Sequence, residues 1–403
     1  MNPALPTIDR EYAVDLLADL VRINSVNPMT SQGGAGRDDP DQPGEYVLAL
    51  RLAQELRALG AAVELSPAEE AGEDAERRPN VTGRWKGRGD GPEVILCSHL
   101  DTVDVSGMDR PFEPAVQDGR MFGRGSLDAK GQLVMFLAAV HAAQNCGNPL
   151  PADVTFAAVS DEEDQSVGAR SLLKALKGDF CVVGEPTGLD LVIAHKGFFW
   201  IEIEAQGKAV HGSVPEQGID AIAKMADVIR ALEGLKPSLK ERVHPLLEHP
   251  KLHMGVIEGG SGPSTVPDRC RLTAEVRTCR AGETEEIFAL IQESLARLAE
   301  ADSDLWADAR LGVVRHPMEI SADHPLVSGL SSAVEVQLGK RPERTVMGAW
   351  TDAGLFAEKM PTVIFGPGEL RLAHSHEESV PIDEVVEGAA IILRFLASPP
   401  RAG

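Results

Sequence analysis

Residues 94–101 read VILCSHLD, an apolar run that ends in a histidine and an aspartate. Two similar runs follow at Val154–Val159 and Cys181–Val183, and the segments Ala129–Gln144 and Val167–Leu176 have the apolar spacing of helices. Short apolar strands that alternate with helices are typical of an α/β domain, in which helices cover a sheet. The sequence therefore predicts an α/β fold with a mixed sheet covered by helices.

Two amphipathic helices are predicted ahead of this region, over Glu11–Val21 and Glu45–Leu59, and Gly60 ends the second of them. The Gly-, Asp- and Pro-rich stretch Ser31–Gly44 between them is predicted to be a loop. The segment Ala68–Arg78 is acidic and lacks periodicity, so we expect a mobile surface loop there.

A different pattern begins after Leu191. The stretch Phe198–Ala205 alternates apolar and polar residues, as a strand of a half-solvated antiparallel sheet does. A helix, two strands and a second helix are predicted next, at Asp220–Leu232, His253–Ile257, Cys270–Arg277 and Thr284–Ala299. We expect this segment to form a separate α+β domain inserted into the first one.

The α/β pattern returns near the C-terminus, with an apolar run at Met360–Phe365 and a closing helix over Glu384–Leu396. The predicted organisation is one domain made of residues 1–191 and 314–403, interrupted by an inserted domain at 192–313. The length of 403 residues agrees with two domains, because a domain usually contains about 100–200 residues.

The charge balance is strongly acidic, with 39 Lys and Arg against 62 Asp and Glu and a formal net charge of −23. Nucleic acids and anionic membrane surfaces are bound through clustered Lys and Arg, so neither is an expected partner. The sequence has no run of about 18 apolar residues, and Met1–Arg10 lacks the pattern of a secretory signal. We expect a cytoplasmic protein.

The cysteines are odd in number, widely spaced and absent from any C-x-x-C pair. This excludes a disulfide scaffold and a cysteine zinc site. They are Cys97, Cys146, Cys181, Cys270 and Cys279.

Ionisable residues follow the apolar runs of the α/β pattern at the points where strands are predicted to end. Sites in open α/β sheets form outside the carboxyl ends of the strands. We therefore expect these side chains to lie at one edge of the sheet. They are His99, Asp128, Glu162, Glu163, Glu185 and either His374 or His376.

Clustered carboxylates raise one another's pKa, so they stay ionised together only beside cations. Two Zn²⁺ ions would be neutralised by three ligating carboxylates and one bridging hydroxide, and mixed histidine and carboxylate ligation suits zinc. Other first-row metals are alternatives. Each residue alone has a simpler explanation: Asp128 as a helix cap, Asp161–Asp164 as a solvated helix start, Glu185 as a loop residue. Their conjunction predicts a metal site.

Four segments together resemble the signatures of a di-zinc family that contains acetylornithine deacetylase, succinyl-diaminopimelate desuccinylase, aminoacylase and glutamate carboxypeptidase. The segments are His99–Asp101 (HLD), Gly123–Gly131 (GRGSLDAKG), Asp161–Glu163 (DEE) and Gly184–Thr187 (GEPT). The resemblance covers nearly the whole chain. It implies a catalytic α/β domain and an inserted ferredoxin-like domain that serves as lid and dimerisation domain.

The resemblance also implies two zinc ions per subunit, with cobalt or manganese as substitutes. By this similarity His99 and Glu185 hold one ion, Glu163 and a C-terminal histidine hold the other, and Asp128 bridges both.

Glu162 is then the general base, and Asp101 orients His99, because a metal-bound imidazole usually donates its other N–H to a carboxylate. The family shows a histidine followed four positions later by Glu. His374 keeps this spacing to Glu378, so His374 is favoured over His376.

Further residues follow from the same resemblance. His211 lies in a segment similar to the family's oxyanion donor and would act in the active site of the partner subunit of a homodimer. Arg277 lies where the family binds a substrate carboxylate, although an ion pair is an alternative. Gly366 and Gly368 would let the backbone approach the substrate closely, or form only a turn.

The sequence favours a metal-dependent amidohydrolase that cleaves an N-acyl-L-amino acid with a metal-activated water and a Glu base. A dipeptidase or carboxypeptidase of the same family is the alternative, and a metal-binding relative without activity belongs to a different class. A serine hydrolase would need G-x-S-x-G, which is absent. A single-zinc H-E-x-x-H protease is excluded because His376–Val380 reads HEESV, and Gly123–Gly125 lacks the third glycine of a dinucleotide site.

Overall fold

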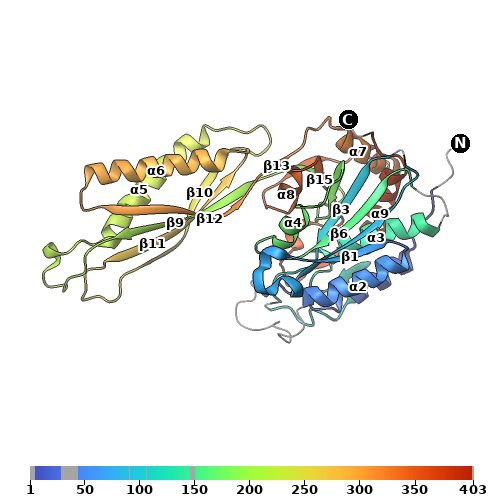
Figure 1. Cartoon of the computed structure of the whole chain (residues 1–403), viewed down its shortest axis with the longest axis horizontal. Coiled ribbons are helices and arrows are strands. Elements are labelled where there is room, and N and C mark those ends of the chain that lie inside the picture. Colours follow the sequence, from blue (N-terminus) through green and yellow to red (C-terminus); the bar gives the residue numbers. More distant parts are fainter. Residues whose placement is uncertain (1–4, 29–43, 90, 106, 146–149, 402–403) are drawn as a thin grey trace. The chain divides into compact units, whose positions relative to one another are not determined.

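The computed structural model describes residues 5–28, 44–89, 91–105, 107–145 and 150–401. The chain forms two compact units, which are described separately (Figure 1). The first contains Met1–Ile193, Glu319–Thr345 and Thr351–Gly403; the second contains Ala194–Met318 and Val346–Trp350.

The sequence predicts an inserted domain over 192–313. In the structure the main part of the second unit extends from Ala194 to Met318. No pattern in the sequence predicts that Val346–Trp350 returns to this unit. The loop predicted over Ser31–Gly44 lies outside the described residues except for Gly44, and so does Cys146. The described cysteines are buried and free of disulfide bonds.

The large sheet has the strand order β1-β2-β6-β3-β7-β15-β8-β13, and β14 pairs with β8. Strands β6, β3, β7 and β15 are parallel, whereas β1 and β2 at one side are antiparallel. The mixed α/β sheet that the sequence predicts is thereby confirmed. The strands are β1 (Ala62–Pro67), β2 (Pro79–Trp85), β3 (Glu93–His99), β6 (Asp153–Val159), β7 (Phe180–Val183), β8 (Leu191–His195), β13 (Met318–Glu319), β14 (Arg344–Met347) and β15 (Thr362–Ile364).

Helices cover this sheet because each presents an apolar face to it. α3 is buried along nearly its whole length, as expected of a helix that is apolar on all sides. α4 (Val167–Leu172) packs against β2 and β6, and α8 (Ala353–Ala357) packs against β15. The helices that share one apolar core are α1 (Arg10–Val21), α2 (Gly44–Ala58), α3 (Lys130–Asn145), α7 (Pro325–Leu338) and α9 (Ile382–Ala397).

A small antiparallel sheet joins distant parts of the first unit. It contains β4 (Ala115–Gln117), β5 (Arg120–Phe122) and β16 (Ser379–Pro381) in the order β16-β5-β4. The pairing of β16 with β5 brings the segment after His374 next to the residues that precede Asp128.

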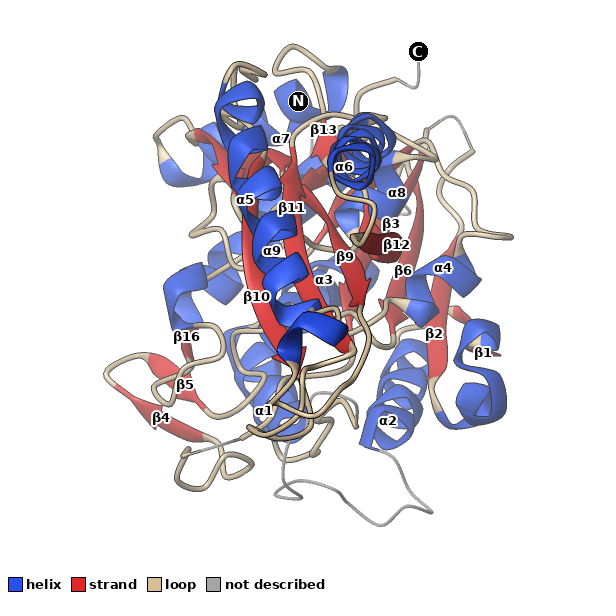
Figure 2. Cartoon of the chain, turned by 90° about the vertical axis from the view of Figure 1, so that its left-hand side faces the viewer, coloured by secondary structure: helices blue, strands red, loops and turns tan. Residues whose placement is uncertain are grey.

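The second unit is a β-α-β-β-α-β fold with the sheet order β10-β11-β9-β12, which is the ferredoxin-like arrangement. Helices α5 and α6 pack on one face of this sheet (Figure 2). The alternation predicted for β9 is present, with its odd-numbered residues buried under the helices. The elements are β9 (Gly197–Gln206), α5 (Ala221–Lys240), β10 (Lys251–Gly259), β11 (Arg269–Thr278), α6 (Glu283–Ala301) and β12 (Trp306–Arg315).

Two expectations about local structure are wrong. The segment expected to be a loop over Ala68–Arg78 contains a 3₁₀ helix, η1 (Glu69–Arg77), and Arg78 at its end is buried. The helix expected to end at Leu232 continues to Lys240. The first difference arises because short polar segments carry little apolar periodicity. In the second, Gly234 and Pro237 disfavour a helix locally, yet Leu235 and Leu239 continue its apolar face and Leu239 is buried in the core.

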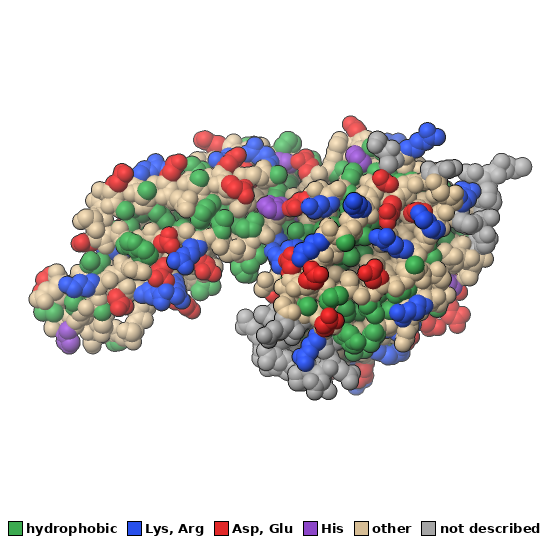
Figure 3. Space-filling model, in the orientation of Figure 1, with side chains coloured by type: hydrophobic (Ala, Val, Ile, Leu, Met, Phe, Trp, Pro, Cys, Tyr) green, Lys and Arg blue, Asp and Glu red, His purple; other side chains and the backbone are tan. Residues whose placement is uncertain are grey.

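Acidic and basic side chains are interspersed over the faces of both units that Figure 3 shows. No helix within the described part of the chain is long and apolar enough to cross a membrane.

His195, at the end of β8, gives the second unit a pH-dependent stability. Its Nδ1 contacts the Lys196 carbonyl at 3.0 Å, its Nε2 has no hydrogen-bond partner among the described residues, and burial lowers its pKa from 6.5 to about 4. In the unfolded chain His195 is protonated below pH 6.5, whereas in the folded protein it stays neutral down to about pH 4. Acidification over this window should therefore cost up to about 3 kcal/mol of unfolding free energy.

The variant His195→Asn keeps an N–H donor and loses the titration. Urea unfolding at several pH values should show a smaller loss for this variant than for the parent between pH 6.5 and 4. Equal losses in both proteins would contradict the assignment.

Candidate metal centre

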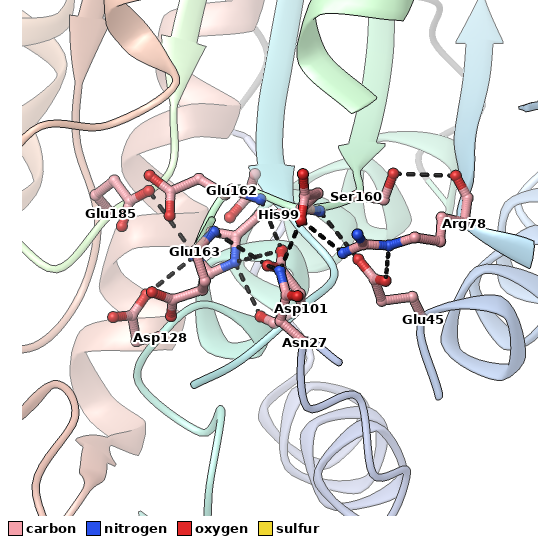
Figure 4. A network of polar contacts seen from close by, with 12 residues as sticks. Asn27, Glu45, Arg78, His99, Asp101, Asp128, Ser160, Glu162, Glu163 and Glu185 are labelled. Carbon is pink, nitrogen blue, oxygen red and sulfur yellow. Dashed lines mark hydrogen bonds and ion pairs between the residues drawn. The ribbon is translucent and has the colours of Figure 1, made fainter. Parts of the chain in front are cut away.

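The carboxyl ends of adjacent parallel strands carry the ionisable residues of the site (Figure 4). β3 ends at His99, Glu162 and Glu163 follow β6, and Glu185 follows β7. Asp128 comes from the segment between β5 and α3. The topology therefore brings these five residues to one edge of the sheet.

Asp128 lies between two imidazoles. Its Oδ1 is 3.0 Å from His99 Nε2, and its Oδ2 is 3.3 Å from His374 Nε2. Each imidazole also meets a glutamate: Glu185 Oε1 is 3.9 Å from His99 Nε2, and Glu163 Oε2 is 3.2 Å from His374 Nε2. The site thus contains two similar donor sets that share one aspartate.

These donors fit divalent cations. One ligand atom each from His99, Asp128 and Glu163 lies within 4.8 Å of the others. The second oxygen of Glu163, Oε1, is buried and has no hydrogen-bond partner among the described residues. A buried carboxylate oxygen of this kind needs a cation or a donor. Imidazole and carboxylate ligands suit zinc and other first-row divalent metals.

The pKa shifts of the carboxyl groups in the site also favour a bound cation. Burial raises the pKa of Glu163, and it raises the pKa of Glu162 and Glu185 well above their usual range. Burial also opposes ionisation of Asp128, but hydrogen bonds from His374 and His99 outweigh it and lower the pKa of Asp128. Divalent cations would relieve this crowding of carboxyl groups.

Asp101 organises the loop that carries the two glutamates. Its carboxylate accepts the backbone N–H groups of Glu162 and Glu163, each at 3.0 Å. His99 Nδ1 lies 2.9 Å from the Asp101 backbone carbonyl and 3.5 Å from its carboxylate, so the carbonyl is the closer acceptor. Nδ1 therefore donates to the Asp101 carbonyl, and Nε2 is the ring nitrogen that faces Asp128.

The two C-terminal histidines lie in different surroundings. His374, with a left-handed φ of +61°, contacts Asp128 and Glu163. The His376 ring lies against Gly107, where an added Cβ would be 2.8 Å from its Cε1. The contacts therefore favour His374 as the ligand.

Glu378 has a function that the sequence did not reveal beyond its spacing to His374. It is fully buried, its Oε1 accepts the backbone N–H groups of Leu127 and Asp128 at 3.1 Å each, and its Oε2 pairs with Arg124. Glu378 therefore fixes the backbone at Asp128. The pairing of β16 with β5 brings Glu378 to this segment, so no local sequence pattern predicts the contact.

The two glycines after β15 are required by the chain's own packing. A Cβ on Gly366 would lie 2.6 Å from the Glu185 carbonyl, and one on Gly368, whose φ is +85°, would lie 2.1 Å from Leu127 Cδ1. They therefore allow the segment after β15 to approach two site-bearing loops closely. Contact with substrate stays a prediction.

His211 and Arg277 belong to the second unit. His211 Nδ1 accepts the Ser213 backbone N–H at 3.1 Å, so the neutral ring carries its proton on Nε2, as an oxyanion donor requires. Arg277 makes the ion pair that the sequence left open, with Glu275 at 2.6 Å, and its guanidinium lies over Phe198. The functions of both residues in catalysis stay predictions.

Imidazoles and carboxylates gathered at the strand ends of an α/β sheet are suited to metal-dependent hydrolysis. The model of peptidase family M20/M25/M40 matches residues 95–398, and the chain belongs to this family. It is therefore a hydrolase that acts on amide bonds, and its donor cluster agrees with the metal dependence of the family.

Two relatives are acetylornithine deacetylases. The chain is 29% identical to that of Edwardsiella ictaluri (strain 93-146), over 88% of this chain and 91% of the relative. It is 27% identical to that of Proteus mirabilis (strain HI4320), over 94% and 93% respectively.

Solved structures share the fold over nearly the whole chain. Aminopeptidase PepT of Bacillus cereus ATCC 10987 has a TM-score of 0.77 at 21% identity and covers 97% of this chain and 98% of its own. The YXEP protein of Bacillus subtilis, a dinuclear metal-binding peptidase of the M20 family, has a TM-score of 0.70 at 16% identity and covers 96% and 97%.

Proposed function

We propose that the protein is a zinc-dependent amidohydrolase that removes the acyl group from an N-acyl-L-amino acid. The observation that carries this proposal is the position of Asp128 between two donor sets, one with His99 and one with His374. An aspartate with one oxygen toward each set is suited to bridge two cations. The similarity to two acetylornithine deacetylases favours an N-acyl amino acid over a peptide.

Five side chains would hold two zinc ions per subunit, for which cobalt or manganese could substitute. His99 and Glu185 would bind one ion and Glu163 and His374 the other, with Asp128 shared by both. When bound, such ions acidify a water and polarise the amide carbonyl.

Glu162 would move the proton. It lies beside Glu163 in sequence, its backbone is fixed by Asp101, and burial raises the pKa of its carboxyl well above the usual range. A raised pKa makes the carboxylate a stronger base toward water, and the same group can return the proton to the leaving amine. Asp101 would hold His99 and the glutamate backbones in place.

The second unit would serve as a lid and as the dimerisation domain of a homodimer. His211 Nε2–H would stabilise the developing oxyanion in the partner subunit. Arg277 would bind the substrate carboxylate, for which it must exchange its ion pair with Glu275. Gly366 and Gly368 would line the substrate path, and the enzyme would act in the cytoplasm.

The test is a turnover assay on N-acetyl-L-ornithine, other N-acetyl and N-succinyl amino acids, and dipeptides, with zinc or cobalt added. We expect hydrolysis of at least one N-acyl amino acid at a higher kcat/KM than any dipeptide, abolished by a chelator and restored by metal. Preference for dipeptides would support a dipeptidase instead. Bound metal without any turnover would indicate a non-catalytic relative.

A further inference from the structure

A buried network of charged side chains lies beside the candidate metal centre, at the right of Figure 4. Arg78, just before β2, donates from Nε to Glu45 Oε2 at 2.6 Å and from Nη2 to Asp161 Oδ1 at 2.7 Å. The side chain of Arg78 is only 8% exposed, and those of both acids 1%. Breaking such a buried pair is costly, so its members are held firmly in place.

The network controls the backbone just ahead of Glu162. Asp161 has a left-handed φ of +69°, which is uncommon for a residue with a side chain. Its backbone N–H donates to Glu45 Oε1 at 2.9 Å, and its Oδ2 accepts the N–H groups of Gln165 and Val167 at 3.2 and 3.3 Å. Glu45 thus binds both Arg78 and the loop, and these contacts maintain the left-handed conformation.

Asn27 connects this network to the residue that orients His99. Its Nδ2 donates to Asp161 Oδ1 at 2.9 Å and to Asp101 Oδ2 at 2.8 Å. Asp101 in turn accepts the backbone N–H groups of Glu162 and Glu163. A continuous series of hydrogen bonds therefore runs from α2 through Arg78 to the backbone of the proposed base and of a proposed ligand.

We propose that Arg78 and Asn27 are positioning residues of the metal centre, which hold the loop at Asp161–Glu163 in the conformation that aims Glu162 and Glu163. This rests on the proposed function. Arg78 reaches the loop through Glu45 and Asp161, and Asn27 reaches it through Asp161 and Asp101, so neither is assigned a direct part in binding metal or substrate. Residues that orient metal ligands in this way typically contribute about 10–100-fold to metal affinity or activity.

The test compares Arg78→Lys with Trp85→Phe. Lysine keeps the positive charge but lacks the planar fork that reaches both Glu45 and Asp161. Trp85 lies at the other end of β2, where its Nε1 donates to the Leu59 carbonyl at 2.8 Å, so Trp85→Phe also removes a buried hydrogen bond from the same strand. Zinc affinity is measured by chelator competition, together with kcat, KM and the melting temperature of the metal-free protein.

We expect Arg78→Lys to bind zinc about 10–100-fold more weakly and to lose kcat by a similar factor, with KM nearly unchanged. Trp85→Phe should lower the melting temperature while zinc affinity and kcat stay at the parent values. If Arg78→Lys instead behaves like Trp85→Phe, the network is structural only and the proposal is overturned.

If Arg78→Lys does not fold, Asn27→Ala provides the test. The carboxylates of Asp161 and Asp101 each keep their other hydrogen-bond donors in this variant. Weaker zinc binding in Asn27→Ala would support the positioning function, and parental zinc affinity and kcat would refute it. Failure of the proposed function is distinguishable, since the parent protein itself would then bind no zinc or hydrolyse no amide.

Discussion

Replacing Glu162 with glutamine should lower kcat by about 10²–10⁴-fold while the protein keeps its metal, because that factor is typical for a positioned general base. Glutamine has nearly the same shape and can still accept hydrogen bonds, but it cannot take up a proton at neutral pH. KM should change little, since the lost interaction matters in the transition state and not in substrate binding.

Asp164→Asn is the matched control, because it removes a carboxylate from the same loop. Its kcat should stay within about twofold of the parent, as is usual for a residue outside the catalytic group. Steady-state kinetics and metal analysis of both variants test the prediction. Parental kcat in Glu162→Gln would show that another group is the base.

Replacing Asp128 with asparagine should have a still larger effect on metal content. Asp128 supplies an anionic oxygen to each donor set, 3.0 Å from His99 Nε2 and 3.3 Å from His374 Nε2. An amide has one neutral oxygen and one N–H₂ group, so it cannot bridge two cations. We expect zinc binding to be at least about 100-fold weaker than in the parent, because loss of a residue that only supports a ligand already costs about 10–100-fold. Turnover should not be measurable.

The same isosteric change at Asp118 provides the control. Asp118 lies in the exposed turn between β4 and β5 with a φ of +48°, a conformation that asparagine tolerates well. Asp118→Asn should therefore keep both zinc and activity. Equal zinc content in Asp128→Asn and the parent would remove Asp128 from the set of ligands.

Much of the fold could be predicted because apolar periodicity reports buried faces directly. The runs that became β3, β6 and β7 are buried on both sides, and β9 is buried on one side, so each has a clear pattern. β12 was missed because its burial does not alternate regularly. The short return of Val346–Trp350 to the second unit leaves no periodic signal at all.

The candidate site could be predicted to the extent that strand ends determine it. His99, Glu163 and Glu185 follow apolar runs that form strands. The carboxyl ends of parallel strands lie at one edge of the sheet, so these residues are expected there. Arg78 could not be found in this way, since it ends a polar segment whose side-chain partners, Glu45 and Asp161, are distant in sequence. The backbone contacts of Glu378 depend on a strand pairing that no local pattern encodes.

The most direct test of the account is the metal content of the purified protein. After dialysis against zinc and removal of free metal, elemental analysis should find two equivalents of zinc per chain. Two equivalents are expected because Asp128 serves two donor sets, each with one histidine and one glutamate. A protein that is fully folded under these conditions yet retains no zinc, cobalt or manganese would contradict the central claim.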